Sequence, residues 1–200
     1  MIITIGRQHG SGGHDIARAV ASRLGIPCYD KEIVDETASS SNFSREVVNS
    51  FDEKRVSAFV AQEPHIFPFG EGYNLNMQIA AAQFEAIRSV AERGDAVFVG
   101  RCADYVLRGR DDILRVFVMG ETSKRIRTVM SRYSIDEDRA KKLIREVDRD
   151  RASYYRYYTD RIWGEASNYD LCINGATLGV ERAAEVILVC AGTMGKDTER

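Results

Sequence analysis

Small residues between an apolar strand and an amphipathic helix restrict how the first part of this chain can fold. The apolar run at residues 2–5 predicts a buried strand, and apolar side chains at helical spacing over residues 16–24 predict a helix that begins near Gly13. Between them, Gly10, Gly12 and Gly13 allow backbone N–H groups to turn inward beside the positive N-terminal end of the helix. The segment therefore predicts a loop that binds a phosphate group.

This loop departs from the Walker A pattern GxxxxGK[ST], in which the lysine neutralises the β- and γ-phosphates and the hydroxyl binds Mg²⁺. Arg7 stands where the first glycine belongs, Gly13 where the lysine belongs, and His14 where the serine or threonine belongs. A glycine-rich turn without a ligand is the alternative, because strand-to-helix turns need glycine for their own geometry. Nucleotide binding is nevertheless the leading hypothesis.

Length and charge limit the remaining classes of protein. The 200 residues suit one ordinary domain, and a net charge of −2 argues against general nucleic-acid binding, which usually requires a basic excess. No apolar run approaches the roughly 20 residues of a membrane span, and the first predicted strand leaves no room for a cleavable signal peptide. We therefore expect a cytoplasmic protein that binds neither nucleic acid nor membranes.

The cysteines and histidines lack the spacing that is typical of metal sites. The four cysteines are far apart and lie in or beside apolar segments, which favours reduced, mostly buried thiols over disulfides. The three histidines show no ligand spacing with cysteine, so no metal site is predicted. The cysteines are Cys28, Cys102, Cys172 and Cys190.

Strands and helices alternate along the chain. Strands are predicted at residues 2–5, 26–29, 96–99, 114–119 and 169–173. Helices are predicted to begin near residues 13, 30, 44 and 122, and to span residues 76–93, 103–107, 134–158 and 180–190. Ser134 and Glu137 form a predicted capping box, and a loop is predicted at residues 63–73. Five strands separated by helices imply an α/β fold with parallel pairing and right-handed crossovers.

Ligands bind such sheets at the carboxyl ends of the strands. The glycine-rich loop, Asp30, Arg101 and the segment after Met119 all follow strands, so we expect them at that edge. Arg101 is placed to grip a phosphate or a base, with Asp104 orienting it; a buried salt bridge between the two is the alternative. Asp30 caps the helix that follows, faces the substrate, or does both.

A second concentration of charge lies at residues 139–161, which contain eight basic and four acidic side chains. On a helix, Arg145 and Arg149 share one face, while Asp148 and Arg151 lie one turn apart. Such a face suits a triphosphate, because guanidinium groups match phosphate oxygens. A solvated helix crossed by ion pairs is the alternative.

Five short segments are not specific one by one, but their order and spacing along the chain together are specific for a family. They are residues 3–13 (Ile-Thr-Ile-Gly-Arg-Gln-His-Gly-Ser-Gly-Gly), 29–32 (Tyr-Asp-Lys-Glu), 98–105 (Phe-Val-Gly-Arg-Cys-Ala-Asp-Tyr), 148–155 (Asp-Arg-Asp-Arg-Ala-Ser-Tyr-Tyr) and 169–174 (Tyr-Asp-Leu-Cys-Ile-Asn). Together they span nearly the whole chain. The set resembles the cytidylate kinase-like family, a branch of the nucleoside monophosphate (NMP) kinases.

The resemblance implies a P-loop three-layer α/β fold with a five-stranded parallel sheet, as a single domain over residues 1–192. It implies a helical NMP-binding insertion at about 30–95 and an Arg-rich helical lid at about 121–161, followed by a tail at 193–200. It also implies ATP and Mg²⁺ as cofactors, with Mg²⁺ held mainly through the phosphates.

Individual residues carry over from the same resemblance. Arg101 matches the Gly-Arg pair that holds the CMP side in bacterial cytidylate kinases. Asp148, Arg149 and Arg151 match the Asp/Arg-rich run of the lid to within a residue or two, which makes Arg145 a further candidate. The family carries arginine where this chain has His14, and this departure bears on γ-phosphate binding.

We interpret the chain as an enzyme that transfers the γ-phosphoryl group of ATP to a nucleoside monophosphate, with CMP or dCMP as the expected acceptor. Gly13 and His14 favour one alternative, a nucleotide-binding sensor or regulatory module without turnover. Residues 63–73 favour another, a kinase for a non-nucleotide small molecule. The expected partners are small-molecule substrates, and no oligomeric state is predicted.

The predicted site residues fall into three groups. Catalytic candidates are Arg145, Asp148, Arg149 and Arg151; phosphate-binding candidates are Arg7, Gly10, Ser11, Gly12, Gly13, His14 and Arg18; acceptor-binding candidates are Asp30, Arg101 and Asp104.

Overall fold

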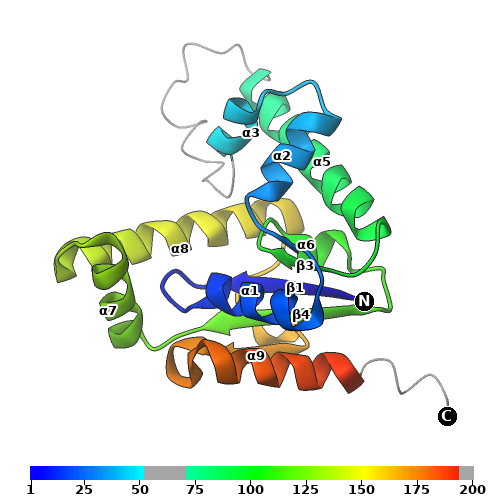
Figure 1. Cartoon of the computed structure of the whole chain (residues 1–200). Helices are drawn as coiled ribbons and strands as arrows, with labels where there is room; N and C mark the ends of the chain where they lie inside the picture. The colour runs from blue at the N-terminus through cyan, green and yellow to red at the C-terminus, as the bar shows by residue number, and fades with distance from the viewer. Residues whose placement is uncertain (52–70, 194–200) are drawn as a thin grey trace.

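A computed structural model describes residues 1–51 and 71–193 of the chain, with helices on both faces of a parallel sheet (Figure 1). The strands are β1 (Ile2–Arg7), β2 (Cys28–Tyr29), β3 (Ala96–Val99), β4 (Ile113–Met119) and β5 (Leu171–Asn174). The helices are α1 (Gly13–Leu24), α2 (Glu32–Ser40), α3 (Arg45–Phe51), α5 (Glu71–Glu92), α6 (Ala103–Val106), α7 (Thr122–Tyr133), α8 (Glu137–Thr159) and α9 (Gly175–Thr193), with a 3-10 turn η1 (Ala166–Asn168).

The five strands pair in parallel in the order β2-β3-β1-β4-β5, which confirms the predicted α/β class and sheet. β1 lies at the centre, where Ile2 pairs with Ala96 of β3 on one side and with Ile113 of β4 on the other. A central strand of a parallel sheet is covered on both faces, so Ile2, Ile3 and Ile5 of β1 are fully buried.

Side chains of β1 alternate between two cores. Ile3 and Ile5 pack with α1 and α9 on one face, whereas Ile2 packs with α5 and α6 on the other. In Figure 1, α9 lies beneath the sheet, and α2, α3 and α5 extend above it. These two cores fix the strand ends that carry the candidate site.

The start of α9 packs against the glycine-rich loop. A Cβ atom at Gly175 would lie 2.6 Å from the carbonyl oxygen of Ser11 and 2.6 Å from Cγ1 of Val118, so only glycine fits there. Close approach of α9 therefore supports the loop from below.

The predicted capping box at Ser134 is wrong. Ser134 has a left-handed φ of 53° and ends α7. Asp136 caps α8 instead, because its side chain accepts a 2.8 Å hydrogen bond from the backbone N–H of Arg139. Asp30 is also not the cap of α2, since that helix begins at Glu32 with Lys31 as the preceding residue.

Two predicted segments fall mainly outside the described residues. Residues 63–70 of the predicted loop are not described, and residues 71–73 belong to α5. The predicted tail lies outside the described residues beyond Thr193. Among the helices that are described, none has the length and apolar character that crossing a bilayer requires.

We expect Gly175→Ala to destabilise the protein by about 1–3 kcal/mol, because the added methyl overpacks the contact with Ser11 and Val118. Gly109→Ala is the matched control, since a Cβ there meets nothing within 4 Å. Chemical denaturation of both variants measures the difference, and equal midpoints would contradict the packing of α9 on the loop.

Candidate functional site

Three strand ends and α8 surround an open cavity of about 350 Å³ at the carboxyl edge of the sheet. Residues from the ends of β1, β2 and β3 meet there, as the order of parallel strands predicts. The lining residues are Arg7, Gln8, His9, Gly10, Gly12, Gly13, His14, Asp30, Lys31, Arg101, Arg132, Tyr133 and Arg151.

The charges around this cavity are strongly unequal. Among the described residues that line it, five are arginine or lysine, and Asp30 is the one carboxylate. The chain as a whole has a net charge of −2, so the positive charge is a local property of this edge. Such a surface attracts anions with several negative charges. The basic lining residues are Arg7, Lys31, Arg101, Arg132 and Arg151.

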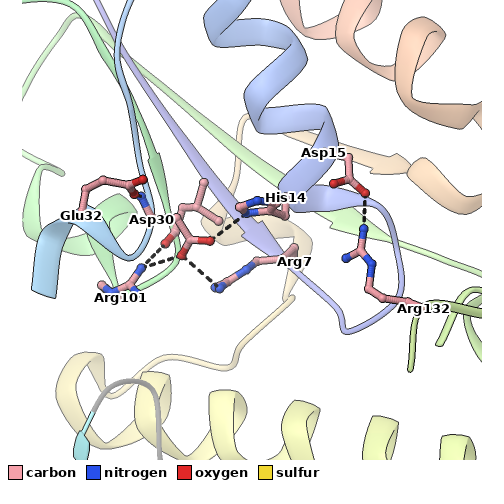
Figure 2. Close-up of polar contacts among 8 residues, drawn as sticks. Arg7, His14, Asp15, Asp30, Glu32, Arg101 and Arg132 are labelled. Atoms are coloured by element: carbon pink, nitrogen blue, oxygen red, sulfur yellow. Dashed lines mark hydrogen bonds and ion pairs between the residues drawn. The ribbon is translucent and has the colours of Figure 1, made fainter. Parts of the chain in front are cut away.

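Asp30 contacts basic side chains from three directions (Figure 2). Its Oδ1 accepts a 2.8 Å hydrogen bond from Nη1 of Arg101 and lies 3.8 Å from Nη2 of Arg7. Its Oδ2 lies 2.8 Å from Nδ1 of His14. Arg101 is 3% exposed and also donates to the carbonyl of Val99, whereas Asp30 is only partly buried.

The glycine-rich loop needs glycine at two positions. Gly10 and Gly12 have φ angles of 76° and 84°, in the left-handed region that side chains disfavour. A Cβ at Gly10 would also lie 2.8 Å from the carbonyl oxygen of Arg125. α1 begins at Gly13, and both Gly12 and Gly13 line the cavity, so the first turn of the helix, whose N–H groups have no partner within the helix, lies beside it.

Two helices hold this loop in place through His9. The backbone N–H of His9 donates to Oδ1 of Asp148 at 2.7 Å, and its carbonyl accepts from Nε of Arg125 at 2.8 Å. Arg125 also forms an ion pair with Asp148, so α7 and α8 are joined where they contact the loop. Asp148 therefore positions the loop and does not line the cavity.

The His9 side chain is half-buried and stacks on Tyr133, with ring centroids 5.8 Å apart. Burial, followed by the positive charge of Arg151, lowers its pKa from 6.5 to about 4. Among the described residues, none makes a hydrogen bond with its buried Nε2. His9 is therefore neutral at physiological pH.

A buried polar cluster lies behind Arg101. Asp104 accepts a 2.6 Å hydrogen bond from the hydroxyl of Tyr155, and the hydroxyl of Tyr169 accepts from the backbone N–H of Gly164. Burial raises the pKa of Asp104. Burial, followed by the negative charge of Asp104, raises the pKa of Tyr155. The prediction that Asp104 orients Arg101 or pairs with it is wrong: Asp104 bonds to Tyr155 of α8, and Arg101 pairs with Asp30.

The structure brings together eight of the predicted site residues at the cavity and places six elsewhere. The eight are Arg7, Gly10, Gly12, Gly13, His14, Asp30, Arg101 and Arg151. Ser11 is buried with its hydroxyl donating to the carbonyl of Gln8, and Arg18, Arg145 and Arg149 are exposed outside the lining. Asp104 and Asp148 serve the contacts described above.

Sequence reasoning missed Lys31 and Arg132. Lys31 follows Asp30 directly, so the rule that placed Asp30 at the sheet edge also applies to it. Arg132 reaches the cavity from the last turn of α7 and donates to Asp15 at 2.6 Å (Figure 2). No local pattern marks Arg132, because its place depends on how α7 packs beside the loop.

The residues present fit a nucleotide better than a protein-held metal ion. Within the described parts of the chain, no group of three or more His, Cys, Asp or Glu side chains is arranged to hold a metal. The one lining carboxylate, Asp30, is engaged by Arg101 and His14. A divalent cation that enters with a nucleotide would therefore depend mainly on phosphate oxygens.

Comparison with known proteins identifies the type of fold. The model of the cytidylate kinase-like family matches residues 2–177. An uncharacterised protein from Eubacterium ventriosum has a similar structure, with a TM-score of 0.74 and 29% identity over 96% of this chain and 99% of that one. None of the curated proteins compared with the chain matches it.

More distant structures share the fold. Shikimate kinase from Bacteroides thetaiotaomicron has a TM-score of 0.55 and 14% identity, covering 96% of this chain and 98% of its own. Deoxyadenosine kinase from M. mycoides with bound dATP has a TM-score of 0.50 and 10% identity, covering 96% and 99%. The predicted P-loop fold is confirmed.

We expect the stability of the protein to fall as the pH drops from 6.5 toward 4, because His9 must take up a proton on unfolding in this range. The pKa of His9 is lower in the folded than in the unfolded state. Its contribution to the free energy of unfolding is therefore complete above pH 6.5 and is lost near pH 4. In His9→Gln this part of the pH dependence should disappear. Denaturation at a series of pH values tests it; superimposable profiles would contradict the assignment.

Proposed function

The chain belongs to the cytidylate kinase-like family, and we propose that it transfers the γ-phosphoryl group of ATP to a nucleoside monophosphate, with CMP or dCMP as the first acceptor to test. One observation carries the proposal. Five cations surround a glycine-rich loop and the start of a helix, with one carboxylate among the described lining residues. Phosphoryl transfer depends on such positioning and charge neutralisation, because the migrating group carries its charge on several oxygens.

The donor side of the proposed site is the loop. Backbone N–H groups of Gly10, Gly12 and Gly13 bind phosphate oxygens, and the N-terminus of α1 adds positive potential. Arg132 and Arg151 approach the loop from α7 and α8. When bound, Mg²⁺ would neutralise phosphate charge, held mainly through the phosphates themselves.

The acceptor side is the edge of Asp30, Lys31 and Arg101, next to α2. Arg101 is fixed by Asp30 and by the carbonyl of Val99, so its guanidinium is preorganised for a phosphate. An acceptor phosphate needs no strong general base, which agrees with a site made mainly of cations. Exposed Arg18 is less well placed for this task than the lining arginines.

Two other functions differ in what they require of this site. A sensor without turnover would bind ATP through the same loop and leave the acceptor side unused; Gly13 and His14 at the Walker positions favour it. A kinase for a non-nucleotide small molecule would use an acceptor hydroxyl, and the carboxylate of Asp30 favours it, since a carboxylate binds a hydroxyl better than a phosphate.

A coupled assay of ATP consumption against a panel of nucleoside monophosphates and small hydroxyl compounds separates the three. Turnover with CMP or dCMP is the expected result. Turnover with a hydroxyl compound alone would replace the acceptor, and ATP binding without any turnover would favour the sensor.

Arg101→Ala should raise the KM for the acceptor about 10- to 100-fold, because it removes a charged hydrogen bond worth about 1.5–3 kcal/mol. The KM for ATP should change much less. Arg108→Ala is the control, because this exposed arginine follows the same strand and lies on the ring of Tyr105. If Arg101→Ala changed thermal stability alone, its contact with Asp30 would be purely structural.

Arg151→Ala should lower kcat at least about tenfold, equal to about 1.4 kcal/mol of barrier, with a smaller change in the Kd for ATP. Arg149→Ala, two residues away on α8, should have a smaller effect because its side chain is exposed outside the cavity. Steady-state kinetics and calorimetry measure both quantities. Equal kcat values for wild type and Arg151→Ala would remove Arg151 from the catalytic group.

A further inference from the structure

Arg7 occupies the space that a side chain at position 13 would need. A Cβ atom built on Gly13 would lie 2.5 Å from Cβ of Arg7, which is closer than real Cβ atoms approach, and 3.1 Å from its Cγ. The clash is with the stem of Arg7 near the backbone, so rotation of its far end does not relieve it. Arg7 and any larger residue at position 13 therefore exclude one another.

These are also two of the positions at which the loop departs from the Walker A pattern. That pattern has glycine at the position of Arg7 and lysine at the position of Gly13. Here the small and the basic residue are exchanged. The two departures therefore belong together. Arg7 at the end of β1 provides the basic side chain, and Gly13 at the start of α1 leaves the space that this side chain occupies.

The guanidinium of Arg7 lies between the loop and the acceptor side. Arg7 is 8% exposed, lines the cavity, and has Nη2 3.8 Å from Oδ1 of Asp30. Figure 2 shows its side chain directed from the strand end past His14 toward Asp30 and Arg101. A phosphoryl group that passes from the donor to the acceptor would therefore lie close to the guanidinium of Arg7.

The other lining arginines come from outside the central strand. Arg132 is tied to Asp15 on α1, and Arg101 is tied to Asp30 and Val99 on the acceptor side. Arg151 donates at 3.1 Å to the backbone carbonyl of Arg7, so its position depends on both α8 and β1. Arg7 alone among them belongs to the central strand, whose place the sheet fixes on both sides.

We propose that Arg7 supplies the phosphate-neutralising charge that the lysine supplies in Walker A loops, and that Gly13 is glycine to make room for it. The inference rests on the proposed function and names the residue on which phosphate binding at that site depends. Arginine offers a planar fork for two phosphate oxygens, where lysine offers a single ammonium group.

The test uses the full chain, with ATP and inorganic tripolyphosphate as ligands in calorimetry. Arg7→Met keeps the apolar stem against Gly13 and removes the charge; it should weaken binding of both ligands about 10- to 100-fold, as loss of a charge-assisted contact does. Arg23→Met is the control, because Arg23 is exposed in the last turn of α1, paired with Glu185. Wild-type affinity in Arg7→Met would overturn the proposal. If that variant fails to fold, Arg7→Gln provides the same comparison.

A second arm tests the steric exchange. Gly13→Lys should lower the melting temperature of the wild-type chain, because the new side chain meets the stem of Arg7. In Arg7→Gly/Gly13→Lys, which has the Walker residues at both positions, binding of tripolyphosphate should recover at least about tenfold over Arg7→Gly. No recovery in a folded double variant would overturn the exchange.

The two proposals fail in different ways. If Arg7→Met loses tripolyphosphate binding but the wild-type chain transfers no phosphoryl group, the role of Arg7 is supported and the proposed kinase activity is contradicted. If the wild-type chain turns over but Arg7→Met keeps full tripolyphosphate affinity, the kinase activity is supported and the role of Arg7 is contradicted.

Discussion

Repulsion among like charges at the carboxyl edge of the sheet is the constraint on which the site depends. Parallel strands bring Arg7 and Arg101 to one edge, and helices add further cations. Asp30 lies among these groups, within 2.8 Å of Arg101 and 3.8 Å of Arg7, and offsets part of their charge. The remaining positive charge favours anions at the cavity, while the Asp30 contacts keep the arginines in defined positions.

The parts of this arrangement that depend on strand order could be predicted from the sequence. Asp30 and Arg101 are 71 residues apart, yet both follow strands of one parallel sheet, so their proximity at the edge was expected. The glycine-rich loop was recognisable for a similar reason, since its residues are neighbours in sequence. Whether each of these residues has its predicted role stays a prediction.

The parts that depend on helix packing could not be predicted. Arg125 contacts the loop and Arg132 contacts the first turn of α1 because α7 lies beside them, and no local pattern sets that position. At the start of α8, Ser134 and Asp136 both resemble caps, and the short connection from α7 decides between them by forcing Ser134 into a left-handed conformation. The exposure of Arg145 and Arg149 likewise follows from which face of α8 packs inward.

α8 connects the glycine-rich loop with α5 and α6. Near its middle, Asp148 holds the loop through the backbone of His9; further along, Tyr154 donates to Gln83 of α5 at 3.0 Å, and Tyr155 donates to Asp104. α8 is one continuous helix of 23 residues, so it links these contacts directly. In the proposed kinase, such a link would give donor and acceptor binding one coupling free energy: by linkage, the factor by which a donor changes affinity for an acceptor equals the factor by which the acceptor changes affinity for the donor.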